Sequence, residues 1–509
     1  MICYLLTLIK AETDVSWAND LSTVNLSLFE PLSLGSDRLE TLRNLSLNVS
    51  NLELESKVSA EGGAFRYISP QIVMSIRNMS AKSCKSTSSG GSFYIESTNI
   101  LHFDNCSFWN SSSISSGGSI YVTTTNLVLL NGSIFNMTQG QYGGSLYIKG
   151  RINVTNSWFE KSEASVSGGS IFINGLVNDK AYPINNCFFG ECKCAQGGGA
   201  IFISSSENIK TEIMDCTFYL CSSSNGNGGA VYIASQGQSI RCELKRICFS
   251  RCFINSTSYL GTSVYILSSS NDLLLSFDMV SCSCCGIIGY SQGTLSLYYG
   301  QQSINALNIS KCISAQSSGF CFYPYISSTY LYINLLNCSS SANDVIYSSS
   351  TSQTIDMVYI NVLSNSATNI ISFYSNLYKY TFKFSVLIGN TGRLFYGVWY
   401  NQIVRNCFIV HNGQISSGFV IESCITTSST SELTPTYVIT HYSTYLCQTP
   451  HDLGSLDAPC QTFPEEYKEC PTYFPEPTAC DVITANAEHS FIILSSLIRI
   501  MMVSLINIY

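Results

Sequence analysis

Charged residues are scarce in this chain. Asp, Glu, Lys and Arg make up 11% of its 509 residues, against roughly 25% in typical soluble domains. The net charge is -8, and Lys and Arg do not gather in a large basic patch. A surface for nucleic-acid phosphates needs such a patch, so we expect no DNA or RNA partner.

Motifs for catalysis and metal binding are also lacking. The chain has five histidines, His102, His411, His441, His451 and His489. None of them stands in a motif with a Ser or Cys nucleophile. Cys192-x-Cys194 and Cys282-x-Cys284-Cys285 are closely spaced, yet neither has a partner Cys or His at the spacing of a zinc site. We expect no cofactor, no bound metal and no enzymatic activity.

Cysteine itself is abundant. The 23 cysteines form an odd total and are scattered along the chain, so no disulfide pairing can be read from the sequence. The chain also holds 12 Asn-x-Ser/Thr sequons, a number compatible with passage through a secretory pathway. We expect the fold to bury some of them, such as Asn105.

Pairs of glycines recur every 25 to 30 residues over the first half of the chain. Their second members are Gly63, Gly91, Gly118, Gly144, Gly169, Gly199 and Gly229. A fixed period of this size is the mark of a stacked repeat. Short runs of β-branched and aromatic residues make each unit a coil of strands rather than of helices. We expect each pair to supply backbone angles that other residues avoid.

An aromatic residue between two apolar ones follows most of these pairs. The positions are Tyr94, Tyr121, Tyr147, Phe172, Phe202 and Tyr232, with Tyr265 one unit further on. Strand alternation places these rings opposite the core-facing side chains, as an exposed stacked stripe. Such a stripe either binds a sugar or protein ligand or stabilises the stack by contacts between coils.

A second motif follows each glycine pair by about 12 to 18 residues, as Asn-Cys-Ser-Phe at 105–108 and Asn-Cys-Phe-Phe at 186–189. We expect its Asn to bond to the Asn of the next coil and its small residue to fill a tight corner. The cysteines assigned to this corner are Cys106, Cys187, Cys216, Cys248, Cys282, Cys312, Cys338 and Cys407. They form either an interior ladder of small apolar side chains or disulfides between coils.

The spacing of both motifs persists beyond the last glycine pair, to about residue 430. We therefore predict an all-β fold, a right-handed parallel β-helix of about fourteen coils over residues 55–430. With strands about 4.8 Å apart, the stack would be roughly 65 Å long.

The pairing of Gly198-Gly199-Ala200-Ile201 and its equivalents with a downstream F-x-x-N-like element resembles the repeats of bacterial polymorphic outer-membrane proteins. Related right-handed β-helix surface proteins of protists are similar. Ser often replaces Ala after the glycines here, and the closing Asn is mostly absent. The resemblance implies a pectin-lyase-like fold and a surface protein with a role in adhesion or host interaction.

The residues outside the repeat divide into four segments. Residues 1–11 contain a short apolar run that makes a weak signal segment, and residues 12–54 are expected to form an N-terminal cap or irregular first coils. Residues 431–490 are rich in Cys and Pro and are expected to form a stalk. The apolar segment 491–509, with Arg499 inside it, is a marginal membrane anchor, a terminal packing segment or a cleaved lipid-anchor signal.

Three functions are compatible with this architecture. The leading one is non-enzymatic adhesion to a host-cell or extracellular glycan or protein, by a monomeric solenoid at the cell surface or outside the cell. The second is a polysaccharide lyase or hydrolase, which would need charges clustered at equal positions in neighbouring coils. The third is a structural extracellular spacer.

The distribution of charge favours the first function over the second. The aspartates fall at differing places in their coils, at Asp104, Asp215, Asp278, Asp344 and Asp356. One local basic group is present, formed by Arg241, Lys245, Arg246 and Arg251. We interpret these charges as solvated, with contact to an anionic glycan as the alternative.

Overall fold

The computed structural model describes residues 23–34 and 46–427, with short gaps at 70–73, 98, 176–179, 207, 236–238, 269–271, 350–353, 375–378, 398–401, 411–414 and 416–417. All of these residues belong to one unit of the chain, Met1–Lys468. The predicted signal segment, stalk and apolar C-terminal segment lie outside the described residues.

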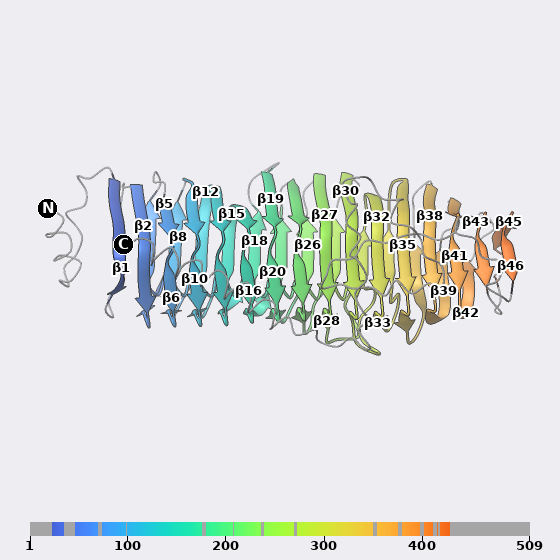
Figure 1. The fold of residues 1–509 in the computed structure, drawn as a ribbon, viewed down its shortest axis with the longest axis horizontal. Helices are drawn as coiled ribbons and strands as arrows, with labels where there is room; N and C mark the ends of the chain where they lie inside the picture. The colour runs from blue at the N-terminus through green and yellow to red at the C-terminus, as the bar shows by residue number, and fades with distance from the viewer. Residues whose placement is uncertain are drawn as a thin grey trace, which may run out of the picture. The chain divides into compact units, whose positions relative to one another are not determined.

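The described residues form an all-β parallel solenoid, which confirms the predicted fold class. Its strands stack side by side from β1 (Thr23–Leu34) to β46 (Ile425–Thr427) (Figure 1). The stack has about 12 turns, close to the expected fourteen, and the described region contains no helix. We name the sides of the solenoid faces A to D, in the order in which the chain crosses them after each glycine pair.

Face A holds the strands that follow the glycine pairs or their later equivalents. They are β4 (Phe65–Ser69), β8 (Phe93–Ser97), the first half of β12 (Ile120–Asn131), the first half of β15 (Leu146–Thr155), β18 (Ile171–Gly175), β22 (Ile201–Ser205), β26 (Val231–Ser235), β29 (Val264–Ser268), β31 (Leu295–Tyr298), β34 (Phe320–Tyr323), β37 (Asp344–Ser349), β39 (Ser366–Tyr374) and β42 (Thr391–Gly397).

Face B follows face A in each coil. Besides β1 and the second halves of β12 and β15, it holds β2 (Ser46–Glu55), β5 (Met74–Arg77), β9 (Leu101–Asp104), β19 (Lys180–Asn185), β23 (Ile209–Met214), β27 (Ser239–Ser250), β30 (Asp272–Ser283), β32 (Gln301–Ser310), β35 (Ser328–Leu336), β38 (Thr354–Leu363), β40 (Lys379–Lys383), β43 (Gln402–Arg405) and β45 (Phe419–Glu422).

Face C carries short strands, and several of the long strands of face B continue onto it. The short ones are β6 (Ser80–Lys82), β10 (Ser107–Trp109), β13 (Ile134–Asn136), β16 (Trp158–Glu160), β20 (Phe188–Gly190), β24 (Thr217–Tyr219), β41 (Val386–Ile388), β44 (Phe408–Val410) and β46.

Face D is built from a separate sheet of eight strands. They are β3 (Val58–Ser59), β7 (Lys85–Ser86), β11 (Ser112–Ser113), β14 (Gln139–Tyr142), β17 (Glu163–Ser167), β21 (Lys193–Cys194), β25 (Ser222–Ser223) and β28 (Phe253–Ile254). The next coil has no strand at 286–291, and β33 (Ile313–Ser314) and β36 (Ser339–Ser340) belong to the large sheet. The chain beside β28 and β33 projects from the solenoid (Figure 1).

The stack begins before the predicted start at residue 55. Strand β1 pairs in parallel with β2, and β2 pairs with β5 in the same sense. The register of β1 shifts between Ser27 and Leu32. The segment assigned to a cap or irregular coils therefore contributes two paired strands to the solenoid.

Two corners are turned by residues in the left-handed backbone region. At the corner between faces B and C (the BC corner), φ is 50 to 60° at Asn78, Asn105, Asn156, Asn186, Asp215, Arg246, Met279, Ala306, Tyr332, Tyr359, Phe384, Asn406 and Ser423. At the corner between faces C and D (the CD corner), φ is 51 to 55° at Ser56, Ser83, Asn110, Met137, Lys161, Glu191, Leu220, Arg251, Cys284, Lys311, Asn337 and Ser364. Asn tolerates this conformation better than most residues, which explains its recurrence at the BC corner.

The Asn residues of the BC corner bond from coil to coil, as predicted. Asn186 Nδ2 donates to Asn156 Oδ1 at 2.7 Å, and Asn156 Nδ2 donates to Asn131 Oδ1 at 2.9 Å. The prediction that Asn105 is buried is wrong, because the turn directs its side chain outward and leaves it exposed. Another sequon residue, Asn308, is fully buried.

The two glycines of each pair serve different needs. The first takes the left-handed angle, as at Gly117 with φ +66°. The second has an ordinary φ but no space for a side chain. A Cβ on Gly118 would lie 1.9 Å from the carbonyl oxygen of Gly144 in the next coil. The prediction that the pair supplies special backbone angles thus holds for the first glycine. The second glycine, Gly63 and its equivalents, is instead needed because neighbouring coils approach closely there.

The interior is filled by side chains that repeat from coil to coil. In β15, buried and half-buried residues alternate over all ten positions, as expected for a strand with one face in the core. Behind face C, six fully buried phenylalanines stack with centroids 4.7 to 4.9 Å apart, namely Phe108, Phe135, Phe159, Phe189, Phe218 and Phe249. Five of them are the bulky residues that close the second sequence motif, and Phe135 directly follows the copy at 131–134.

A search of the described residues for a helix long and apolar enough to span a membrane finds none.

Candidate functional site

The seven predicted rings of face A lie in register, one per coil. Tyr121 pairs with Tyr94 and Tyr147, and the same register continues through Phe172, Phe202 and Tyr232 to Tyr265. The residues on either side of each ring are buried, so the ring itself faces outward. Six rings are half-buried and not fully exposed as predicted, and Tyr265 is only 6% exposed.

The row of rings continues for five coils beyond Tyr265. Centroid distances of 4.4 to 5.7 Å join it to further rings. The additional members are Tyr298, Tyr323, Tyr347, Tyr374 and Tyr396. We call this continuous row of twelve rings the aromatic stripe. The five additional rings could not be predicted from the sequence, because no glycine pair precedes them to show where each coil begins.

The rings of the stripe from Tyr94 to Phe202 stack face to face. Neighbouring planes differ by 6 to 10° and centroids are 4.8 to 5.3 Å apart. In this stacked half, each inner ring covers the faces of its neighbours. Solvent therefore meets mainly ring edges and hydroxyl groups.

From Tyr232 onward the rings tilt against one another, and we call this part the tilted half. Tyr232 lies at 77° to Phe202 and at 74° to Tyr265. Its ring leans over Gly197, where an added Cβ would lie 2.7 Å from a Tyr232 ring carbon. At such contacts, at least one ring face is turned away from its neighbour.

The later tilts arise because the stripe alternates between two outward columns of face A. Tyr298 and Tyr323 share the column of Leu267, whereas Tyr347 shares the column of Cys321. The planes differ by 54° between Tyr265 and Tyr298 and by 56° between Tyr323 and Tyr347, where the column changes. They differ by only 18° between Tyr298 and Tyr323, which share a column.

Small buried residues leave room for these changes of column. Ser296, Cys321 and Ser372 occupy the positions that a ring would otherwise fill, and each is at most 3% exposed.

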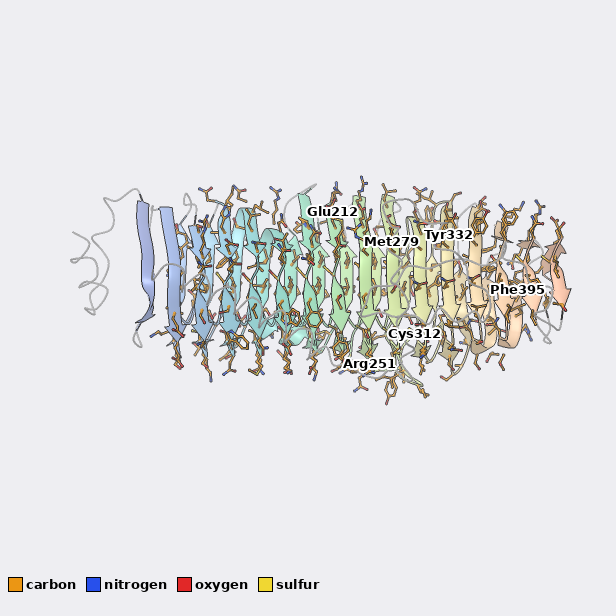
Figure 2. All side chains as sticks on the ribbon, viewed as in Figure 1. Glu212, Arg251, Met279, Cys312, Tyr332 and Phe395 are labelled. Carbon is orange, nitrogen blue, oxygen red and sulfur yellow. The ribbon has the colours of Figure 1, made fainter. Side chains whose placement is uncertain are left out.

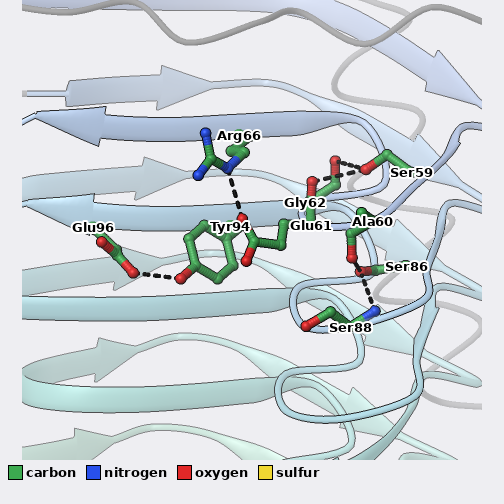
Figure 3. A network of polar contacts seen from close by, with 9 residues as sticks. All are labelled: Ser59, Ala60, Glu61, Gly62, Arg66, Ser86, Ser88, Tyr94 and Glu96. Carbon is green, nitrogen blue, oxygen red and sulfur yellow. Dashed lines mark hydrogen bonds and ion pairs between the residues drawn. The ribbon is translucent and has the colours of Figure 1, made fainter.

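An arginine lies over the ring at each end of the stripe. The Arg66 guanidinium carbon is 5.9 Å from the centroid of Tyr94, and that of Arg393 is 5.0 Å from the centroid of Tyr396. Glu61 holds Arg66 through a 2.7 Å ion pair, and the Tyr94 hydroxyl donates to Glu96 (Figure 3). Each cation–π contact contributes about 0.5–1 kcal/mol at such exposed sites.

Between its two end rings, Tyr232 and Tyr396, the tilted half is a neutral surface. Its strands β29, β31, β34, β37 and β39 contain one charged residue, Asp344, which is 4% exposed. Burial raises the pKa of Tyr374 to about 12, and the Asp344 carboxylate adds to this shift. The surface thus offers neutral rings and neutral hydroxyl donors at physiological pH.

The eight cysteines assigned to one corner do not share it. Cys106, Cys187, Cys216 and Cys407 directly follow the left-handed residue of the BC corner, whereas Cys312 and Cys338 follow that of the CD corner. Cys248 pairs in register with Thr217, and Cys282 with Phe249. The two corners are about five residues apart, so a spacing that varies by six residues could not separate them.

The five aspartates bond to one or two side chains of adjacent coils. Arg246 pairs with Asp215 at 2.5 Å, Lys383 with Asp356 at 3.2 Å and Lys245 with Asp278 at 3.6 Å. Asn131 donates to Asp104 at 2.7 Å, and buried Asp344 accepts from Asn369 and Ser372. These pairs lie at different heights of the solenoid. Across the described residues, no group of three His, Cys, Asp or Glu side chains has the geometry of a metal site.

No protein-family model, curated protein or solved structure matches this chain. The likeness to polymorphic outer-membrane-protein repeats is therefore one of short sequence motifs alone.

Proposed function

We propose that this protein is a non-enzymatic recognition solenoid that binds a neutral glycan along the tilted half of its aromatic stripe. Such a protein would act at the cell surface or outside the cell, in adhesion. The observation that carries the proposal is the change from face-to-face stacking to tilted packing at Tyr232.

Ring orientation matters because the apolar face of a sugar packs on the face of an aromatic ring, not on its edge. An aromatic face carries partial negative charge and attracts the slightly positive C–H groups. The stacked half uses its faces for contacts between coils, which supports a stabilising role there. The tilted half has faces left for a ligand.

The chemistry of the tilted half favours a neutral ligand over an anionic one. From Tyr265 to Tyr374 its strands carry no lysine or arginine, so an anionic polysaccharide would meet a counter-charge only at the end of the row, where Arg393 of β42 lies over Tyr396. Tyr and Ser hydroxyls can donate to and accept from sugar hydroxyls. The row of rings repeats once per coil, which suits an extended chain.

Three further features support a non-enzymatic role at the cell surface or outside the cell. Asn105, Asn110 and Asn255 are exposed sequon residues, compatible with a secreted glycoprotein. The motif resemblance to β-helix surface proteins points to adhesion. The scatter of the aspartates and their partners over different heights of the solenoid supports recognition over polysaccharide cleavage, which would need clustered charges.

The test is binding of the full chain to an array of neutral and anionic polysaccharides. The variant Tyr347→Ser/Tyr374→Ser alters the tilted half, and Tyr121→Ser/Tyr147→Ser is the matched control in the stacked half. We expect the first variant to lose at least tenfold in affinity for a neutral polysaccharide and the second to bind like the wild type. Equal binding by all three proteins would exclude this surface, and cleavage of an anionic polysaccharide would favour an enzyme.

A further inference from the structure

Six cysteines follow the left-handed residue of the CD corner in six consecutive coils. They are Cys192, Cys221, Cys252, Cys285, Cys312 and Cys338. All are buried, with at most 1% exposure, and Cys312 is labelled in Figure 2. We call them the thiol column. Four of the six lie outside the set that the motif spacing identified.

The backbone holds these cysteines in register at the spacing of adjacent strands. Ser222 N donates to Cys192 O at 2.9 Å, Gly286 N to Cys252 O at 2.8 Å and Ile313 N to Cys285 O at 2.8 Å. Adjacent strands lie about 4.8 Å apart, within the Cα separation of about 4.4–6.8 Å that a disulfide requires. Each of the six is a free thiol that donates to backbone carbonyl oxygens, as Cys252 Sγ does to Phe218 O at 3.5 Å.

Cysteine is not needed merely to fill this corner. Lys57, Ser111, Thr138 and Ser162 occupy it in four earlier coils and Cys84 in a fifth, and Asn365 and Asn390 occupy it in later ones. The thiol column instead spans the coils where the sheet of face D ends at β28 and where no strand forms at 286–291. On face D, the pairing of strands between coils is interrupted there.

We propose that the thiol column is oxidised to three disulfides between coils, Cys192–Cys221, Cys252–Cys285 and Cys312–Cys338, which staple the solenoid across this break. This set pairs all six cysteines with direct neighbours. The shifted set, Cys221–Cys252 and Cys285–Cys312, would leave two buried thiols unpaired. Cys248 and Cys284, beside the column, are themselves disulfide-bonded.

The oxidant is a small disulfide such as glutathione disulfide. A cysteine thiolate attacks it, forms a mixed disulfide and releases one glutathione thiolate; the neighbouring thiolate then displaces the second. Each new bond consumes one glutathione disulfide and yields two glutathione thiols. Burial raises the pKa of Cys192, Cys221 and Cys252, so the exchange takes place while the coils stack, before the thiols are enclosed.

Peptide mapping tests the pairing. The full chain is refolded in a glutathione redox buffer, alkylated in denaturant and digested without reduction. We expect linked peptides for the three assigned pairs. Alkylation of all six cysteines at the denaturant step, or links from the column to other cysteines, would overturn the proposal.

Thermal denaturation tests the stapling role. Reduction should lower the Tm of the wild type. The Tm of the variant Cys252→Ala/Cys285→Ala should fall by a smaller amount on reduction, because this variant has one disulfide fewer to lose. Cys242→Ala is the control, since this buried cysteine pairs in register with Thr211 and Leu275; its response to reduction should match the wild type. A wild-type Tm unaffected by reduction would refute stapling even if the links are present.

Discussion

At several positions of this solenoid, the space left by the neighbouring coil decides which residue can be accommodated. Gly118 shows this most directly, since its neighbour across the coil is a carbonyl oxygen rather than a side chain that could move. A backbone contact cannot be relieved by a change of rotamer. The second glycine of a pair should therefore be among the least replaceable positions.

We expect Gly118→Ala to destabilise the protein by about 3 kcal/mol or more, because the added methyl group overlaps the Gly144 carbonyl. Gly140→Ala is the matched control, since its nearest contact would be 3.0 Å and its φ is not positive. Denaturant midpoints measure both. A midpoint shift for Gly118→Ala no larger than that for Gly140→Ala would contradict the close-approach explanation.

A buried carboxyl adds a dependence on pH. Burial raises the pKa of Asp344, although hydrogen bonds from Ser372 and Asn369 oppose the shift. Because the folded-state pKa exceeds the unfolded value of about 3.9, the associated stabilisation is present below that value and is lost as pH rises through the folded pKa. Asp344→Asn keeps an oxygen acceptor without this cost. From about pH 4 to pH 7, the free energy of unfolding of the variant should therefore rise relative to that of the wild type, as measured by denaturant titration at each pH. A difference between the two proteins that stays constant over this range would show that Asp344 does not have a raised pKa in the folded state.

At the scale of the strands, inward and outward rings perform different tasks. Phe159 stacks between Phe135 and Phe189 with no exposed surface, whereas Phe172 stacks between Tyr147 and Phe202 on the half-buried outer face. Both rings have two stacking partners at similar distances. They differ mainly in burial.

Replacement by alanine should separate the two rings. We expect Phe159→Ala to cost about 3–5 kcal/mol, since it opens a cavity in the core. Phe172→Ala should cost only about 1 kcal/mol, since it removes contacts across the strands of a surface row. Denaturant titration of both variants measures the difference. Equal losses would show that the outer row is as important for stability as the core.

The strand register could be predicted from sequence, but the ring orientations could not. The glycine period places Tyr121 and Tyr147 correctly because each coil contributes the same number of residues before the ring. The later tilts depend on a shift of two residues between columns, from the column of Tyr265 and Ser296 to that of Leu267 and Tyr298, and the first tilt depends on the position of the Tyr232 ring beside Gly197. Neither changes the hydrophobic pattern.

The cysteine corner shows a similar limit. Cys187 and Cys192 lie five residues apart, one at each corner of face C. A motif defined by its distance from the glycines cannot separate two such corners when the loop lengths vary. The left-handed angles of the backbone make the distinction.

At the scale of the whole solenoid, the stack outlasts the features that first identify it. Glycine pairs end at Gly229 and the face D sheet ends at β28, yet faces A, B and C continue to β46. Stacked repeats depend on nearest-neighbour contacts, so one face can change while others maintain the register. The tilted half of the stripe and the thiol column both lie across this change, which makes the middle of the solenoid its most specialised part.

Hydroxyl-radical footprinting of the tyrosines, with and without a bound neutral polysaccharide, tests the recognition proposal most directly. We predict protection of Tyr323, Tyr347 and Tyr374 in the complex, with unchanged labelling of Tyr121 and Tyr147. Protection confined to the stacked half, or to side chains of faces B and C, would contradict it.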